Sequence, residues 1–166
     1  MTIPVITTER LTLRPQTMVD WPAFRALMMS KRAEFMGGPM AEQKAWGTFC
    51  HGLALWPLMG HGALMVNRRE DGQCLGQVVI NHGPLFAEKE IGWYVYPDAE
   101  GFGYAFEAAN ALLDWAFNSR GLKTLVSYIE PENTRSIRLA EGLGAQLDAD
   151  APRLDPLDLV YRHFPQ

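Results

Sequence analysis

Residues 90–105 read EIGWYVYPDAEGFGYA, a strand-like run that ends at a proline and leads into a turn with two glycines. A helical pattern begins directly after this turn, so both glycines stand just before a helix N-terminus. The first turn of a helix leaves backbone N–H groups unpaired, and the helix dipole places partial positive charge there. Such a turn binds phosphate or pyrophosphate, so this segment predicts a protein that handles a phosphorylated cofactor.

The segments before the turn are expected to form an antiparallel meander. Their apolar patterns predict strands at residues 62–67, 75–81 and 90–96. The pair Asp71-Gly72 favours a tight hairpin between the first two of these strands, and residues 82–88 are read as a longer loop.

The N-terminal third is expected to supply one more strand and two helices. Residues 8–14 alternate polar and apolar side chains, as a half-buried strand does. Residues 18–30 and 41–55 have helical spacing, and the run from Gly37 to Pro39 separates them.

The segments after the turn complete a β-α-β unit. A helix is expected over residues 102–119, capped by Gly121, with a strand over residues 124–129 directly after it. This connection is a right-handed crossover, so the strands that end at Tyr96 and Ile129 should run parallel. A last helix is expected at residues 134–143.

Two weak strands, at residues 145–147 and 157–162, are expected to close the chain. The predicted fold class is therefore α/β, of the α+β type. Its mixed, mainly antiparallel sheet has six to seven strands, one parallel β-α-β crossover, and helices on both faces.

Composition predicts a single domain over residues 1–166, because 48% of the residues are hydrophobic and only 20% are charged. The net charge is −4 and no block of Lys or Arg occurs, which argues against nucleic acid and an anionic membrane as partners and suits an amine substrate. Cys50 and Cys74 match no metal spacing and indicate reduced thiols. With no signal-peptide pattern, we expect a cytoplasmic protein, either a monomer or a homodimer.

Several stretches resemble the GNAT superfamily of acyl-CoA-dependent N-acyltransferases. Its motifs A and B are similar to GFGYAFEAANALLDWAF and PENTRSIRLAEGLGA. The first and fourth strands of its ribosomal-protein-alanine N-acetyltransferase branch are similar to TERLTLRP and EIGWYVYP. The resemblance implies that acetyl-CoA is the co-substrate, that no metal is needed, and that a primary amine of a protein N-terminus or small molecule attacks the thioester directly.

The pyrophosphate signature of the superfamily falls on Glu100 to Ala105. The resemblance therefore implies that Gly101, Phe102, Gly103, Tyr104 and Ala105 bind the cofactor. Glycines let the backbone close on the phosphates, and a small residue at position 105 leaves room for their oxygens. Glu100 departs from the signature, which has a cation or amide there, and either lowers affinity for coenzyme A or points into water.

Other roles implied by the resemblance fall on Val95, Asn133 and Ser136. Val95 is expected to contact the pantetheine arm and to offer an oxyanion donor from its backbone N–H. Asn133 either contacts the pantetheine or caps the helix that follows it. Many members of the family have a tyrosine acid at the position of Ala140. Because this chain lacks that tyrosine, Ser136 is expected to steady or protonate the leaving thiolate.

Glu90 is the candidate general base, since the alternation of its strand puts its side chain on the same face as Gly92 and Tyr94. The alternative is an ordinary glutamate at the surface end of a strand. Met36, Met40, Trp46, Trp56 and Phe86 are candidates for an apolar acceptor site or for the core.

The four histidines show no ligand spacing and are expected in loops or at the surface. A nicotinamide or flavin oxidoreductase is disfavoured because Phe106 replaces the third glycine of the dinucleotide motif. The remaining alternative is a non-catalytic acyl-CoA-binding sensor or a degenerate acetyltransferase, suggested by Glu100 and the absent tyrosine.

Overall fold

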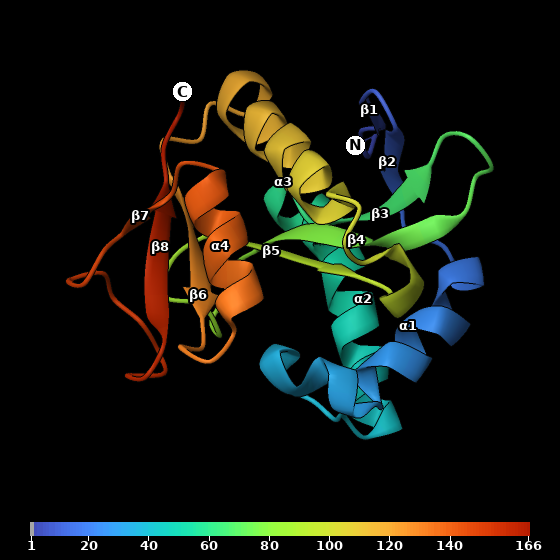
Figure 1. Cartoon of the computed structure of the whole chain (residues 1–166), viewed down its shortest axis with the longest axis horizontal. Coiled ribbons are helices and arrows are strands. Elements are labelled where there is room, and N and C mark those ends of the chain that lie inside the picture. Colours follow the sequence, from blue (N-terminus) through green and yellow to red (C-terminus); the bar gives the residue numbers. More distant parts are fainter. Residues whose placement is uncertain (1) are drawn as a thin grey trace.

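A computed structural model describes residues 2–166 and contains one eight-stranded sheet with helices on both faces (Figure 1). The strands are β1 (Ile6–Thr7), β2 (Leu11–Pro15), β3 (Ala63–Arg68), β4 (Cys74–Asn81), β5 (Glu90–Val95), β6 (Leu125–Ile129), β7 (Gln146–Leu147) and β8 (Leu159–His163). Their order across the sheet is β1-β2-β3-β4-β5-β6-β8-β7. Among the strands of residues 2–166, β5 and β6 alone pair in parallel, as the crossover predicts. The fold class is confirmed. The sheet has eight strands rather than six or seven, because the sequence does not predict the two-residue strand β1.

The helices form two layers. The α-helices are α1 (Trp21–Met28), α2 (Glu42–Met59), α3 (Tyr104–Asp114) and α4 (Thr134–Gly142). The shorter helical segments are η1 (Met18–Asp20), η2 (Lys31–Met36), η3 (Pro97–Ala99) and the π-helical turn η4 (Trp115–Ser119). Helix α3 covers one face of the central strands, while α1, η2 and α2 surround a separate apolar cluster against the other face of β5.

Helix α3 lies in the crossover between β5 and β6, and its apolar stripe fixes its position. Ala108, Ala109 and Leu112 are fully buried and pack against Ile91 and the neighbouring strands. This spacing of three and four residues places the stripe on one side of the helix. Because α3 is anchored over β5, its N-terminus and the glycine turn before it lie beyond the C-terminal end of that strand.

Strands β5 and β6 separate soon after they meet. Their register contains a single pair, Glu90 with Val126, and β6 then pairs along its whole length with β8. Beyond this pair, the Ser127 hydroxyl donates a hydrogen bond of 2.9 Å to the carbonyl of Ile91. The two strands therefore diverge and leave an opening in the sheet between β5 and β6.

Two expectations for the N-terminal third are wrong in detail. The strand expected at residues 8–14 begins only at Leu11, as β2, because residues 8–10 form the turn from β1, which Thr8 closes by donating its backbone N–H to the Leu11 carbonyl at 2.9 Å. The helix expected at residues 18–30 ends at Met28, and Ser30 then caps the separate helix η2. The helix propensity of residues 31–36 does not predict η2. This 3-10 helix is short and therefore depends on the packing of Ala33 and Met36 in the apolar cluster.

Two of the four histidines are buried, contrary to expectation. His61 and His163 are 3% and 2% exposed. His61 Nδ1 lies 2.8 Å from the Ile80 carbonyl, and His163 Nε2 lies 3.1 Å from the Ser127 hydroxyl. Desolvation lowers the pKa of His163 to about 4, so this ring is neutral at pH 7.

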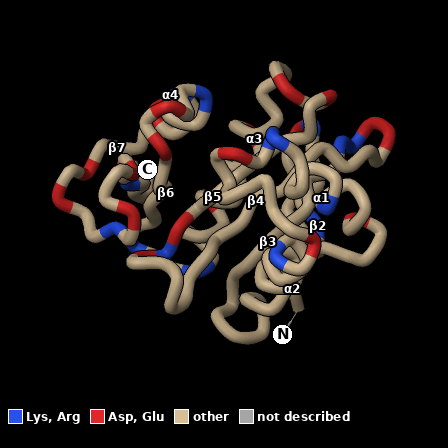
Figure 2. The backbone as a smooth tube through the Cα atoms, turned by 90° about the horizontal axis from the view of Figure 1, so that it is seen from below, with Lys and Arg blue, Asp and Glu red and all other residues tan. Residues whose placement is uncertain are grey.

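Lys and Arg are dispersed along the chain rather than gathered on one face (Figure 2). Within residues 2–166, no helix combines the length and apolar character needed to cross a membrane. In the same range, no group of three or more His, Cys, Asp or Glu side chains is placed to hold a metal ion.

Candidate active site

The glycine turn has the geometry of an anion-binding helix start. Gly101 and Gly103 have φ of +84° and +77°, in the left-handed region that disfavours other residues. Gly103 is the N-cap of α3 and has no side chain to satisfy the first N–H groups of the helix. These donors are therefore available to a ligand at the positive end of the helix dipole.

Arg10 braces this turn from the β1–β2 hairpin. Its Nη1 donates to the carbonyl of Phe102 at 2.9 Å, and its guanidinium lies 4.6 Å from the centre of the Tyr104 ring. Glu107 accepts from Arg10 Nε at 2.6 Å and from the Thr8 hydroxyl at 2.6 Å. The sequence reading missed this brace, because Arg10 and Glu107 are 97 positions apart.

A cavity of about 670 Å³ extends from this turn toward β5 and α4. All of the residues assigned to the cofactor from the sequence except Phe102 line it, namely Val95, Gly101, Gly103, Tyr104, Ala105, Asn133 and Ser136. The Phe102 side chain is 60% exposed, and only its backbone takes part in the turn, where its carbonyl accepts the hydrogen bond from Arg10. The structure thus brings together groups from β5, α3 and α4 that are far apart in the sequence.

A second cavity, of about 850 Å³, lies on the α1–α2 side of β5. Glu90, Asn81 and His51 are among its lining residues. Both cavities are lined by Phe35, Met36, Trp93, Tyr94, Asn133 and Ser136. The shared residues come from η2, β5 and the start of α4, so the two cavities adjoin there, beside the opening between β5 and β6.

The backbone of β5 provides a donor at this junction. The N–H of Tyr96 donates to the Leu75 carbonyl of β4 at 2.8 Å. Backbone N–H groups alternate in direction along a strand, so the N–H of Val95 points away from β4, toward the opening. An N–H in that position is suited to hydrogen-bond an oxygen of a bound ligand.

Glu90 faces the second cavity and not the outer surface. Its Oε2 accepts a hydrogen bond of 3.0 Å from the Asn81 amide on the paired strand β4. Desolvation raises the pKa of Glu90 to about 7, outweighing the Asn81 hydrogen bond and a backbone hydrogen bond with Tyr128. A carboxylate whose pKa lies near neutrality can both accept and release a proton at pH 7.

Asn133 caps α4 and also lines both cavities. Its side-chain oxygen accepts from the backbone N–H of Ser136 at 3.3 Å, which establishes the capping role. The cap places Asn133 and Ser136 side by side at the junction. Ala140, one turn further along α4, is fully buried.

Glu100 is not directed into open water, as one reading of the sequence held. It forms ion pairs with Arg32 of η2 and with Arg135 Nη1 of α4, the latter at 3.1 Å. Its side chain is 23% exposed. The sequence could not show this, because both arginines come from segments distant from the turn.

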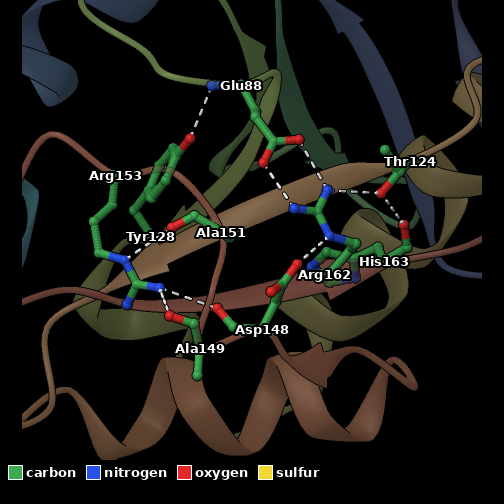
Figure 3. A network of polar contacts seen from close by, with 9 residues as sticks. All are labelled: Glu88, Thr124, Tyr128, Asp148, Ala149, Ala151, Arg153, Arg162 and His163. Atoms are coloured by element: carbon green, nitrogen blue, oxygen red, sulfur yellow. Dashed lines mark hydrogen bonds and ion pairs between the residues drawn. The ribbon is translucent and has the colours of Figure 1, made fainter.

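A polar network fixes the loop that precedes Glu90 (Figure 3). Arg162 of β8 binds both carboxylate oxygens of Glu88, at 2.7 and 2.9 Å, and binds Asp148 at 2.6 Å. The Tyr128 hydroxyl accepts the backbone N–H of Glu88 at 2.9 Å. These contacts join β6, β8 and the start of β5, so they restrain the backbone that carries Glu90.

The apolar residues suggested for the acceptor site have different positions: three line the second cavity, Trp56 is in the core, and Trp46 is exposed. Met36, Met40 and Phe86 line the second cavity. Trp56 is 2% exposed and donates its indole N–H to the Ala63 carbonyl, while Trp46 packs against Trp21. His51, which the sequence analysis placed in a loop or at the surface, lines this cavity and stacks on Phe86.

Comparison with known families assigns this architecture. A model of the acetyltransferase (GNAT) domain matches residues 10–146, which is most of the chain. The chain belongs to the GNAT acetyltransferase family. The resemblance read from the sequence is thereby confirmed, and acetyl transfer is the chemistry of the family.

Relatives of this GNAT protein include an acetyltransferase from Agrobacterium tumefaciens str. C58, with 55% identity and a TM-score of 0.97 over 99% of this chain and 96% of that one. An uncharacterized N-acetyltransferase, YnaD of Bacillus subtilis, is 38% identical over 46% of this chain and 45% of its own. The matches span about half the length of the first two curated relatives.

RimL, a ribosomal alpha-N-protein acetyltransferase in complex with coenzyme A, shares the fold. Its TM-score is 0.77 at 16% identity, over 97% of this chain and 98% of that one.

Proposed function

We propose that this protein transfers the acetyl group of acetyl-CoA to a primary amine by direct attack, and that the α-amine of a protein or peptide is the preferred acceptor. The junction of two cavities at the β5–β6 opening carries this proposal. One cavity reaches the glycine turn and the other contains Glu90. A thioester that enters through the first cavity meets an amine from the second.

In this proposal the cofactor lies along the first cavity. The backbone N–H groups of residues 101–105 bind its pyrophosphate, with the helix dipole of α3 adding to the attraction. The pantetheine arm runs beside β5 toward Val95, and Asn133 contacts its inner end. The N–H of Val95 then donates to the thioester oxygen as negative charge develops on it.

The reaction needs one base and one proton donor. Glu90 accepts a proton from the bound ammonium, directly or through water, and the neutral nitrogen attacks the thioester carbon. A C–N bond forms and the C–S bond breaks. The nitrogen then loses its second proton, which Ser136 or a water molecule relays to the departing thiolate, so the products are the amide and free thiol. A thiol has a pKa of about 8.5, so the thiolate leaves readily and the acid contributes little.

The deprotonation step favours an α-amine over a lysine side chain, whichever base accepts the proton. An α-amino group has a pKa of about 8 and a lysine amine about 10.4. Proton transfer to the same base therefore costs about 3 kcal/mol less from the α-amino group than from the lysine amine.

The walls of the second cavity support a cationic, partly apolar acceptor. Glu130, Asp155 and Asp158 line it together with the exposed side chains of Leu85 and Leu154. Desolvation and neighbouring carboxylates raise the pKa values of Glu130 and Asp158. An acceptor with positive charge would relieve this repulsion, which fits an ammonium substrate.

The test measures release of free coenzyme A thiol from acetyl-CoA with a panel of amines. Two peptides are compared. One has a free N-terminus and no lysine, and the other has a blocked N-terminus and one lysine. We expect release only when an amine is present. The free N-terminus should react at least about tenfold faster, given the difference in proton-transfer cost.

Two results would change this assignment. Tight binding of acetyl-CoA with no turnover across small amines and peptides would identify a sensor or degenerate acetyltransferase. If a calorimetric titration detects no binding of acetyl-CoA, both the active acetyltransferase and the non-catalytic acetyl-CoA sensor are excluded.

A further inference from the structure

The ion pairs of Glu100 join three separate segments at the cofactor cavity. Glu100 directly follows η3, Arg32 belongs to η2, and Arg135 lies in the first turn of α4. All three residues line this cavity. The carboxylate thus bridges two guanidinium groups that the sequence places 103 positions apart.

The bridge leaves most of the binding capacity of both arginines unused. The closest nitrogens to the Glu100 carboxylate are Nη2 of Arg32 and Nη1 of Arg135. A carboxylate accepts only about four hydrogen bonds, so it cannot occupy all the donors of two arginines. A guanidinium has five N–H donors in a planar fork that matches phosphate. One carboxylate with two guanidiniums also leaves a net charge of +1, so the group attracts anions despite its acidic member.

We propose that Glu100 is a positioning residue that holds Arg32 and Arg135 together as a pair that binds the phosphates of the cofactor. This rests on the proposed use of acetyl-CoA. The arginine side chains are 47% and 62% exposed, and without the carboxylate between them they would repel each other and sample many rotamers. Glu100 holds both side chains in place before the cofactor arrives.

The effect expected from replacing Glu100 on the affinity for acetyl-CoA is opposite to that of simple electrostatics. Removing a negative charge from an anion-binding cavity should strengthen anion binding if only the field mattered. Here Glu100→Gln weakens it, because the neutral amide no longer holds the arginine pair. E100R weakens anion binding as well, because the new guanidinium repels those of Arg32 and Arg135 instead of holding them together.

The experiment compares Glu100→Gln with Glu34→Gln. Glu34 lines the same cavity and forms no ion pair among residues 2–166, so its replacement removes the same charge without breaking the bridge. Affinity for acetyl-CoA is measured by calorimetry and kcat/KM by thiol release. S-acetylpantetheine, which lacks all the phosphates, serves as the second acetyl donor.

We expect E100Q to lose about tenfold in acetyl-CoA affinity, the effect of one lost charge-assisted contact, and E34Q to bind equally or more tightly. Activity with S-acetylpantetheine should stay unchanged in E100Q, which a general structural defect would not allow. The variant R32A should show the same loss, and adding E100Q to it should cause little more.

Tighter binding of acetyl-CoA by E100Q would show that Glu100 competes with the phosphates for the arginines, and would overturn the proposal. Equal losses with acetyl-CoA and S-acetylpantetheine would overturn it too. If the wild-type protein binds no acetyl-CoA, the proposed function itself fails, which is a distinct result.

Discussion

Replacing Glu90 with Gln is expected to lower kcat by roughly 100-fold or more at pH 7, the usual contribution of a positioned general base. Gln keeps the size of the side chain and its contact with Asn81, so the lost property is the ability to accept a proton. In the wild-type protein, kcat should fall about tenfold per pH unit below pH 7, because Glu90, with its pKa of about 7, becomes protonated there.

The measurement is kcat from pH 5 to pH 9 at saturating concentrations of both substrates. E90Q should lose the acidic limb of this profile. Glu130→Gln is the matched control, since Glu130 lines the same cavity but lies beyond the C-terminal end of β6, and it should keep the limb. An unchanged limb in E90Q would assign the base to another group.

Stability gives a second readout that separates this role from a folding defect. The pKa of Glu90 is about 7 in the folded protein against 4.5 for the free side chain, so its ionisation opposes folding as the pH rises through that interval. Removing the carboxyl relieves this cost above pH 7. E90Q should therefore have an equal or higher Tm than the wild-type protein at pH 8, while its activity is low.

Replacing Gly103 with Val should weaken acetyl-CoA binding by roughly 10- to 100-fold, the value of one or two hydrogen bonds to a charged group. Gly103 has φ of +77°, which a β-branched residue cannot adopt without strain. The added Cβ itself meets Arg10 Nη2 only at an ordinary 3.6 Å. The turn must therefore change its backbone, and the N–H groups that face the cofactor move with it.

Gly72→Val is the matched control for this substitution. Gly72 has a similar φ of +74°, its Cβ would meet nothing within 4 Å, and it lies in the turn between β3 and β4. Both variants should lose stability to a similar extent in thermal unfolding. Only the Gly103 variant should lose acetyl-CoA affinity in calorimetry, and equal affinities would contradict the role given to the turn.

The parts of the site that depend on local sequence were predictable. The two glycines, the small residue at position 105 and the apolar stripe of α3 are all read within one segment of about 30 residues. The alternation of β5 likewise put Glu90 and Tyr94 on one face, and both line the second cavity. Local backbone rules act over such distances, so pattern alone identifies them.

Features that need a distant partner were not predictable. The environment of Glu100 depends on Arg32, 68 positions earlier, and the loop before Glu90 depends on Arg162, 74 positions after Glu88. The raised pKa of Glu90 arises from burial that appears only when α2, the loop before β5 and β6 close around it. A single sequence does not show which charges pair across a sheet.

A crystal structure of the protein with acetyl-CoA tests the central claim most directly, because the claim is that two cavities meet around one thioester. The account predicts the pyrophosphate on the N–H groups of residues 101–105 and the pantetheine beside β5. It places the acetyl group between Ser136 and the cavity that holds Glu90. A cofactor bound elsewhere, or an acetyl group closed off from that cavity, would contradict it.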